Sequence, residues 1–458
     1  MRIPAVTIPA LAAALLPAVA LAAEVVSTAA DRAELSLTIY QGGLGLVRDR
    51  RMVDLPKGAS VLVVDGVAGR ARDGTGALAA AGVAVREHGF ELAGIDAARL
   101  LAASVGREVT VVWPGSAKEE RATVLAAEPM PLFRVDGKVT AGRPERVLVD
   151  SLPAGLRPAP VWTAKVESSR AGRREADFSY LAEGLDWRAD YSAHLDGDRM
   201  VVAGWATLTN ASGADFEAAR VRVVAGTLNR VPPPPRVMKA ARGEMAMAAA
   251  MDGGAPEAAG PYHVYSLPDP VTIRHGDTRQ VALTAAAAVE VERALILDPV
   301  PSQAWRDRWA DPETRHPTLH LRFRNSLGQP LPAGVVRVTQ AVKDGAPLLV
   351  GEDRLDATPD GAAARIVLGE AFDVTARRVQ TDFVRVAPEV TEAAWEVKLA
   401  NGGDRPAKVT VRERFDGEWL VVDESAQHSR DGAFTAAWTV TVPAKGEAAL
   451  RYRVRVKG

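Results

Sequence analysis

The strongest constraint on this chain is an alternation of apolar and polar residues with period two, which recurs from end to end. The clearest stretches are residues 35–39, 319–324, 395–399 and 450–457. In each, every second residue is apolar, which places the apolar side chains on one face of a β-strand. Antiparallel sheets with one buried and one wet face produce this pattern, whereas parallel sheets give continuous apolar runs.

Asp-Gly dipeptides, which favour tight turns, separate the alternating stretches. They are Asp65-Gly66, Asp136-Gly137, Asp252-Gly253, Asp344-Gly345, Asp360-Gly361, Asp416-Gly417 and Asp431-Gly432. Short alternating strands between such turns predict an all-β protein built from several antiparallel β-sandwich modules. The best helical signal covers residues 95–104, with Leu100 and Leu101 facing inward and Gly106 as the stop.

The same patterns predict four units. Residues 23–94 are expected to form an N-terminal β domain, and residues 95–155 a helix plus a small β-barrel of the SH3 or Sm-like kind. Residues 156–315 are expected to form a β-sandwich domain, and residues 316–458 one or two C-terminal β-sandwich domains. Residues 232–260 begin with four prolines and continue rich in Ala, Gly and Met, which predicts a mobile loop.

The first 22 residues resemble a secretory signal peptide. Arg2 supplies a positive start, residues 3–19 are mostly apolar and uncharged, and Ala20-Leu21-Ala22 provides small residues for cleavage before Ala23. We therefore expect a periplasmic or secreted protein. No later apolar run approaches the ~18 residues that span a bilayer, so no transmembrane segment is expected after cleavage.

Composition excludes several functions. The 56 Lys and Arg residues nearly balance the 57 Asp and Glu residues, which gives no electrostatic basis for binding nucleic acid. The absence of cysteine removes thiolate metal sites, cysteine nucleophiles, redox chemistry and a lipobox anchor. Neither a Gly-x-Ser-x-Gly elbow nor a phosphate-binding loop occurs.

Residues 179–191, Ser-Tyr-Leu-Ala-Glu-Gly-Leu-Asp-Trp-Arg-Ala-Asp-Tyr, carry a resemblance to a known family. Further matching segments are residues 40–49, 210–213, 219–226, 325, 331–334 and 438–456. Together they resemble a bacterial family of unknown function that shares its C-terminal domain with mucoidy-inhibitor-A-like proteins. The resemblance implies the fold but no activity, and this chain lacks the sustained heptads of the coiled-coil insertion that many such proteins carry.

The aromatic block of residues 180–191 is predicted to be architectural. Tyr180, Trp187 and Tyr191 place three large aromatic side chains within twelve positions, which indicates a local core. Gly184 is expected to permit a turn, and Asp186 to bond local backbone.

Two alternatives concern the same region. Asn210 and Gly213 stand in an Asn-Ala-Ser-Gly string that is typical of a turn rather than a nucleophile. Glu183, Asp186 and Asp190 lie close in sequence, and two carboxylates at a suitable separation could perform glycosidase chemistry. We expect a structural role and no catalytic residues.

No metal site or cofactor is expected. His316 and His320 have the spacing of helical metal ligands, but Pro317 lies between them and the following residues read as a strand. Trp305 and Trp309 would either stack on a sugar or pin a connecting segment to a domain. Four methionines in the predicted loop would either bind copper(I) or reflect its drifting composition. They are Met238, Met245, Met247 and Met251.

The expected function is that of a periplasmic or cell-envelope structural or binding protein, non-catalytic, with an envelope protein or glycan as partner. The alternative is an envelope-acting hydrolase on glycan or peptide that uses carboxylates. An enzyme should show a concave site with converging ionisable groups. A binding module should show an exposed apolar patch or a free sheet edge.

Overall fold

The computed structural model describes residues 23–458 apart from 93, 154–155, 227, 230–256, 260–261, 300–312 and 343–344. Several predicted features therefore lie outside the described residues: the signal peptide, nearly all of the mobile loop with its four methionines, and Trp305 and Trp309. Strands make up 65% of the structure and helices 3%, which confirms the all-β prediction. Among the described residues, no helix is long and apolar enough to cross a membrane.

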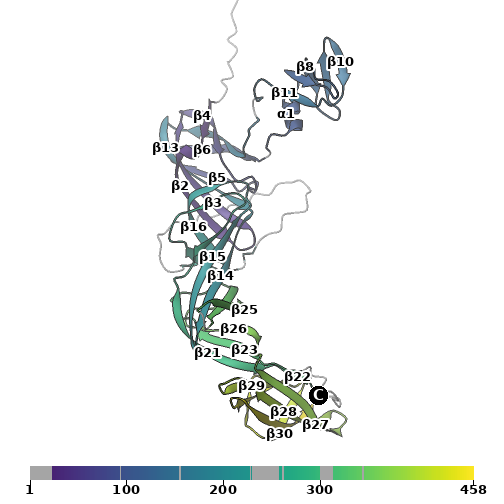
Figure 1. Ribbon diagram of the computed structural model, residues 1–458. Coiled ribbons are helices and arrows are strands. Elements are labelled where there is room, and N and C mark those ends of the chain that lie inside the picture. The colour runs from purple at the N-terminus through teal and green to yellow at the C-terminus, as the bar shows by residue number, and fades with distance from the viewer. Residues whose placement is uncertain are drawn as a thin grey trace, which may run out of the picture.

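Two sheets pack together in the N-terminal module (Figure 1). The first contains, in spatial order, β1 (Ala23–Ser27), β4 (Gly58–Asp65), β12 (Val161–Ser168) and β6 (Val83–Glu91). The second contains β17 (Glu257–Ala259), β18 (Tyr262–Ser266), β16 (Phe216–Ala225), β2 (Arg32–Tyr40), β3 (Leu44–Leu55), β13 (Gly172–Glu183) and β5 (Ala77–Ala80), with β19 (Val271–Ile273) also paired to β16. The short 3-10 turn η1 (Ala29–Asp31) connects β1 to β2.

The pairing in this module crosses the boundary expected at residue 156. β12 lies between β4 and β6, and β13 lies between β3 and β5. The chain therefore leaves the module after β6, forms the next unit, and returns to complete both sheets. Alternation identifies a strand but not its neighbour, so this return is not visible in the sequence.

The inserted unit contains the helix α1 (Ala97–Ala103), which Asp96 caps by accepting a hydrogen bond from the Arg99 backbone N at 2.7 Å. Its strands are, in spatial order, β10 (Lys138–Ala141), β9 (Leu132–Val135), β8 (Glu119–Ala126), β7 (Glu108–Val112) and β11 (Arg146–Leu148). Leu101 and Phe133 belong to its own small core. Among the described residues the edge strands β10 and β11 do not pair with each other, so the closed SH3 or Sm-like barrel is not confirmed.

A long curved sheet runs through the two remaining modules. Its main path is β25 (Pro347–Leu355), β24 (Gly334–Ala341), β14 (Leu185–Asp196), β15 (Arg199–Asn210), β21 (Ala287–Leu297), β29 (Ala407–Arg414), β32 (Thr435–Val442) and β31 (His428–Arg430). Beside this path lie β20 (Thr278–Ala282), β23 (Thr318–Arg324) and β26 (Ala363–Glu370). The last sheet contains β22 (Glu313–Arg315), β27 (Val374–Ala387), β28 (Val390–Asn401), β33 (Gly446–Lys457) and β30 (Glu418–Glu424). The middle module comprises β14, β15, β20, β21 and β23–β26, and the C-terminal module comprises β22 and β27–β33.

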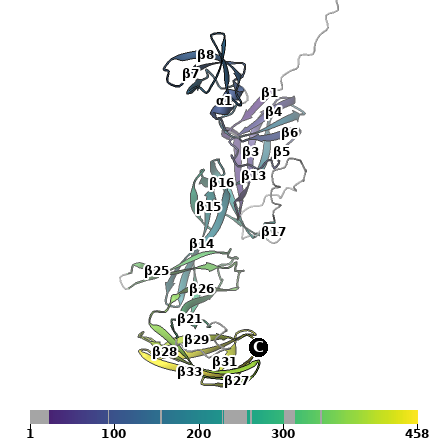
Figure 2. The same cartoon turned by 90° about the vertical axis from the view of Figure 1, so that its right-hand side faces the viewer.

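The modules are joined without linkers, by a one-residue turn and by a shared strand. β13 of the N-terminal module leads through the single residue Gly184 into β14 of the middle module. β21 pairs with β15 at its start and, at Leu295–Leu297, with β29 of the C-terminal module. Figures 1 and 2 show the result, an elongated row of modules with the inserted unit projecting at one end.

The cores follow the predicted alternation. In β33, Leu450, Tyr452, Val454 and Val456 are buried, while the intervening basic residues face outward. One continuous core extends through the N-terminal and middle modules, and the C-terminal module has a second core of its own.

Three of the four asparagines in the sequence occupy the same structural position. Asn210, Asn325 and Asn401 are buried at or just after the end of a strand, and each side-chain oxygen accepts the backbone N–H two residues later. Each amide nitrogen donates to the carbonyl four residues later and to a carbonyl in a facing segment. We call these three sites the asparagine corners.

The segments that face the corners are also alike. In each facing segment the asparagine amide donates to a backbone carbonyl, and the residue three positions later has a positive φ. The carbonyls belong to Ile273, Thr358 and Val442, and the residues with positive φ are Gly276, Gly361 and Lys445. The same corner therefore occurs three times. It is a repeated structural unit that is not evident from the loop sequences.

Candidate functional site

The aromatic block of residues 180–191 lies where the N-terminal and middle modules meet. Trp187 and Tyr191 are buried in β14 and their polar atoms are bonded. Trp187 Nε1 donates to the Val224 carbonyl at 2.9 Å, and the Tyr191 hydroxyl donates to the Pro332 carbonyl at 2.7 Å. Both side chains therefore join β14 to distant segments and present no free group to a ligand.

Tyr180 is buried on the N-terminal side of the junction. Its hydroxyl accepts a hydrogen bond from the Ala68 backbone N at 2.9 Å, and its ring stacks on Phe178 at 5.1 Å between centroids. Burial raises the pKa of the Tyr180 hydroxyl well above its usual range. The hydroxyl therefore stays protonated and serves as a packing and hydrogen-bonding group.

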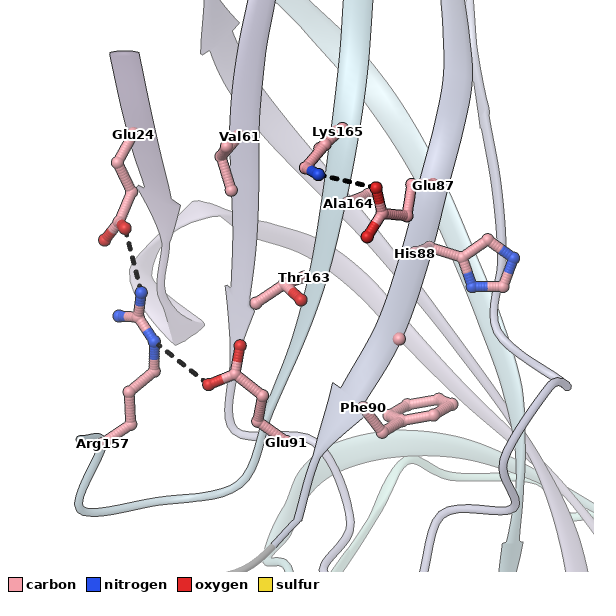
Figure 3. A pocket seen from close by; sticks show the side chains of 11 residues that line it. Glu24, Val61, Glu87, His88, Phe90, Glu91, Arg157, Thr163, Ala164 and Lys165 are labelled. Carbon is pink, nitrogen blue, oxygen red and sulfur yellow. Dashed lines mark hydrogen bonds and ion pairs between the residues drawn. The ribbon is translucent and has the colours of Figure 1, made fainter. Parts of the chain in front are cut away.

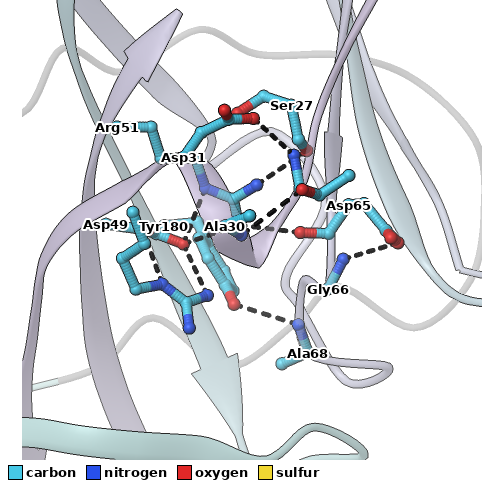
Figure 4. Close-up of polar contacts among 11 residues, drawn as sticks. Ser27, Ala30, Asp31, Asp49, Arg51, Asp65, Gly66, Ala68 and Tyr180 are labelled. Atoms are coloured by element: carbon cyan, nitrogen blue, oxygen red, sulfur yellow. Dashed lines mark hydrogen bonds and ion pairs between the residues drawn. The ribbon is translucent and has the colours of Figure 1, made fainter.

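A buried charge network lies near Tyr180 (Figure 4). Arg51 is only 2% exposed, and its guanidinium donates to the Ser27 and Asp65 carbonyls at 2.8 and 2.7 Å. It also bonds the Asp49 carboxylate at 2.7 Å, which Arg32 contacts at 2.9 Å. Each charge in the network is paired with an opposite charge, which offsets the cost of burying it. The Arg51 guanidinium also links three segments of the N-terminal module.

Gly184 and Asp186 form the turn between β13 and β14. Gly184 has φ of 85°, and a Cβ at this position would lie 2.5 Å from the Ala211 carbonyl oxygen. The Asp186 carboxylate accepts hydrogen bonds from the Gly42 and Gly43 backbone N atoms at 2.9 and 3.1 Å. The carboxylate thereby fixes the tip of the β2–β3 hairpin against β14.

The loop after Asn210 packs against the same junction. The Ser212 hydroxyl donates to Asn210 Oδ1 at 2.7 Å and is buried, so it does not face a substrate. Gly213, with φ of 86°, approaches Gly69, where an added Cβ would lie 3.1 Å from the Gly69 Cα. Its backbone N donates to His275 Nδ1 at 3.1 Å.

The other two carboxylates of the block have separate partners. Glu183 is exposed, 3.7 Å from Arg70. Asp190 is buried and accepts hydrogen bonds from the Thr207 hydroxyl at 2.5 Å and from Arg188 at 3.1 Å. Burial by itself would raise the pKa of Asp190, but these hydrogen bonds outweigh it and hold the pKa below its usual value. The block therefore presents no pair of carboxylates facing a shared space.

His316 and His320 bond to different groups. His316 Nδ1 lies 3.0 Å from the carbonyls of Ala371 and Val374, and His320 Nε2 lies 3.0 Å from the Thr318 hydroxyl. Across the described part of the chain, no cluster of three or more His, Asp or Glu side chains could hold a metal ion.

An open cavity of about 300 Å³ lies on the four-stranded sheet of the N-terminal module, and we call it the sheet groove (Figure 3). Small side chains make its floor: Val61 of β4, Thr163 of β12 and Gly89 of β6. Thr163 and Gly89 are directly paired across the two strands, so they lie on the same face of the sheet.

Ion pairs make the walls of the sheet groove. On one side Arg157 contacts Glu24 at 3.0 Å and Glu91 at 3.8 Å. On the other side Lys165 contacts Glu87 at 2.6 Å. The groove thus offers hydrogen-bond donors and acceptors around a floor of small side chains.

Sequence reasoning missed the sheet groove because its residues come from five separate segments between residues 24 and 165. One signal was available: Gly89 interrupts the strand of residues 83–91, and an isolated glycine within a strand often marks a close approach.

The sequence matches no protein-family model, and a search of curated proteins finds no match to it.

Proposed function

We propose that this protein is a non-catalytic structural or binding protein of the cell envelope, in which stiffly joined β-sandwich modules hold partner sites at fixed separations. The single observation that carries the proposal is that the modules join without a linker, through the one-residue turn at Gly184 and along the shared strand β21. Flexible linkers let modules reorient freely. A strand that is hydrogen-bonded in both modules resists bending, so the row suits a spacer better than a mobile enzyme domain.

The location is part of the proposal. Arg2, the apolar residues 3–19 and Ala20-Leu21-Ala22 support export and cleavage before Ala23, to the periplasm or the exterior. An envelope protein or glycan is the partner we propose, and the balanced charge supports no role with nucleic acid.

A hydrolase acting on envelope glycan or peptide is the second candidate. The observation that favours it is the convergence of Glu24, Glu87 and Glu91 on one cavity. A glycosidase needs two carboxylates facing the scissile bond. Here each carboxylate is already paired with Arg157 or Lys165, which favours the structural proposal.

Fractionation and a hydrolysis assay test the proposal together. Cells producing the full chain should release it with the envelope fraction, with a mature N-terminus at or near Ala23. The purified protein should release no soluble fragments from envelope glycan or peptide. A cytoplasmic product would contradict the location, and fragment release that is abolished by Glu24→Gln, Glu87→Gln and Glu91→Gln together would favour the hydrolase.

A further inference from the structure

We infer that the sheet groove binds a small, uncharged, hydroxyl-rich ligand, a saccharide of one or two rings. The inference adds a ligand class to the proposed function. It rests on that function only for the cell envelope as the place where the protein meets such a ligand. Four features of the groove carry the argument: the open floor, the paired walls, the exposed polar groups of those walls and the volume.

The floor is open because residue 89 is glycine. Its backbone does not lie in the left-handed region, so the conformation does not require glycine. A Cβ built there would meet nothing within 4 Å. Glycine within a strand destabilises it, because its backbone loses more entropy on folding and it has no side chain to pack. The missing side chain instead leaves a flat surface beside Val61 and Thr163, against which one face of a ring can lie.

The walls select against charge. Arg157 and Lys165 are each already paired with a carboxylate. A charged ligand would have to compete with the existing partner for each of these charges. A hydroxyl both donates and accepts, so it bonds a carboxylate and a cation without breaking their pair.

The wall groups that a ligand can reach are the exposed ones. The side chains of Lys165 and Glu87 are 63% and 67% exposed, and those of Glu24 and Glu91 are 49% and 45% exposed. A ligand hydroxyl above the floor can therefore donate to a wall carboxylate or accept from the Lys165 ammonium.

The volume limits the ligand. About 300 Å³ is at the small end of the range of about 300–1,000 Å³ for small-molecule sites. One or two sugar rings suit a groove of this size.

The experiment measures binding of glucose, maltose, N-acetylglucosamine and its β-1,4-linked disaccharide to the purified protein by titration calorimetry and saturation-transfer NMR. Lysine and glutamate serve as charged probes. We expect saturable binding of at least one sugar and none of the charged probes. Gly89→Val should weaken sugar binding by about tenfold or more, because its side chain occupies the floor.

Gly369→Val is the matched control. Gly369 is also a strand glycine outside the left-handed region with open space around its Cβ, but it lies in β26 of the middle module. The Gly369→Val variant should bind sugar as tightly as the unchanged protein does. Arg157→Gln supplies a second variant and should also weaken binding, because it removes a wall donor.

Absence of binding to all four sugars, binding unaffected by Gly89→Val, or preference for a charged probe would each overturn the inference. The result is separable from the proposed function. An exported protein that binds no sugar defeats only this inference, whereas a cytoplasmic protein that binds sugar in the groove defeats only the proposed location.

Discussion

At the scale of single residues, buried side chains with several hydrogen bonds define this fold. The asparagine corners are the clearest case, because a side-chain amide offers two donors and an acceptor in one rigid group. At Asn401 these groups bond the Arg405 and Pro443 carbonyls at 2.8 and 3.0 Å, and the Gly403 backbone N at 2.9 Å. The corner thereby connects the end of β28 to the turn between β32 and β33.

Removing one corner should be costly. Asn401→Ala is expected to lower the free energy of unfolding by about 1.5–4.5 kcal/mol, since three hydrogen bonds contribute about 0.5–1.5 kcal/mol each. Urea denaturation measures this. Asn229 lies outside the three corners, and Asn229→Ala should cost less than about 1 kcal/mol. Equal effects of the two substitutions would show that the corner has no special role.

His320 is predicted to make the protein sensitive to acid. It is 3% exposed, and burial, with help from the Arg365 guanidinium, holds the pKa of His320 below its ordinary value. Above about pH 6.5 the ring is neutral in both states and contributes nothing. As the pH falls below that value the unfolded chain binds the proton first, so stability is lost until the folded pKa is reached.

Thermal melts at pH 7.5 and 5.5 measure this effect. His320→Gln should lose less stability between the two pH values than the unchanged protein does. His194→Gln, which alters an exposed histidine of β14, is the control for replacing a histidine by glutamine. An identical pH dependence for the His320 variant and the unchanged protein would refute the prediction.

At the scale of elements, the turn between β13 and β14 decides how two modules meet. Gly184→Ala should destabilise the protein more than Gly43→Ala does, although both glycines have positive φ. Gly43→Ala incurs only the left-handed penalty of about 1–2 kcal/mol. Gly184→Ala adds the collision with the Ala211 carbonyl, whereas a Cβ at Gly43 would meet nothing within 4 Å. Chemical denaturation of both variants tests this, and equal losses would count against the close contact.

Trp187 is the central anchor of the same junction. Trp187→Ala should cost about 3–5 kcal/mol, as expected for a buried tryptophan. Glu183→Gln, at a side chain that is 51% exposed, should change stability by less than about 0.5 kcal/mol. If the glutamate substitution left folding intact but removed a cellular phenotype, the block would have a functional role that we do not assign to it.

The strands themselves could be predicted, because a half-buried strand shows its buried face in its own sequence. Residues 35–39 and 450–457 lie within β2 and β33, and the helix predicted over residues 95–104 contains α1. Their partners could not be predicted. β12 pairs with β4 across nearly a hundred residues that include the inserted unit, and no local pattern records that contact.

The sheet groove could not be predicted for the same reason. Glu24 and Arg157 meet only because β1 and β12 both lie beside β4. At His320 the alternation itself misleads: it predicts an outward side chain, yet His320 is buried, with Nε2 3.0 Å from the Thr318 hydroxyl.

At the scale of the whole molecule, the account rests on stiffness. The N-terminal and middle modules share one continuous core, and β21 carries the middle sheet into the C-terminal module. Three modules built on repeated corners and joined without linkers form a long body with sites far apart, such as the sheet groove at one end (Figures 1 and 2).

Small-angle X-ray scattering of the purified protein tests this central claim most directly. A compact protein of this length would have a radius of gyration of about 22 Å. We predict a value well above that, with the scattering profile of a single stiff rod. A value near about 22 Å, or a profile typical of modules that move independently on flexible linkers, would contradict the account.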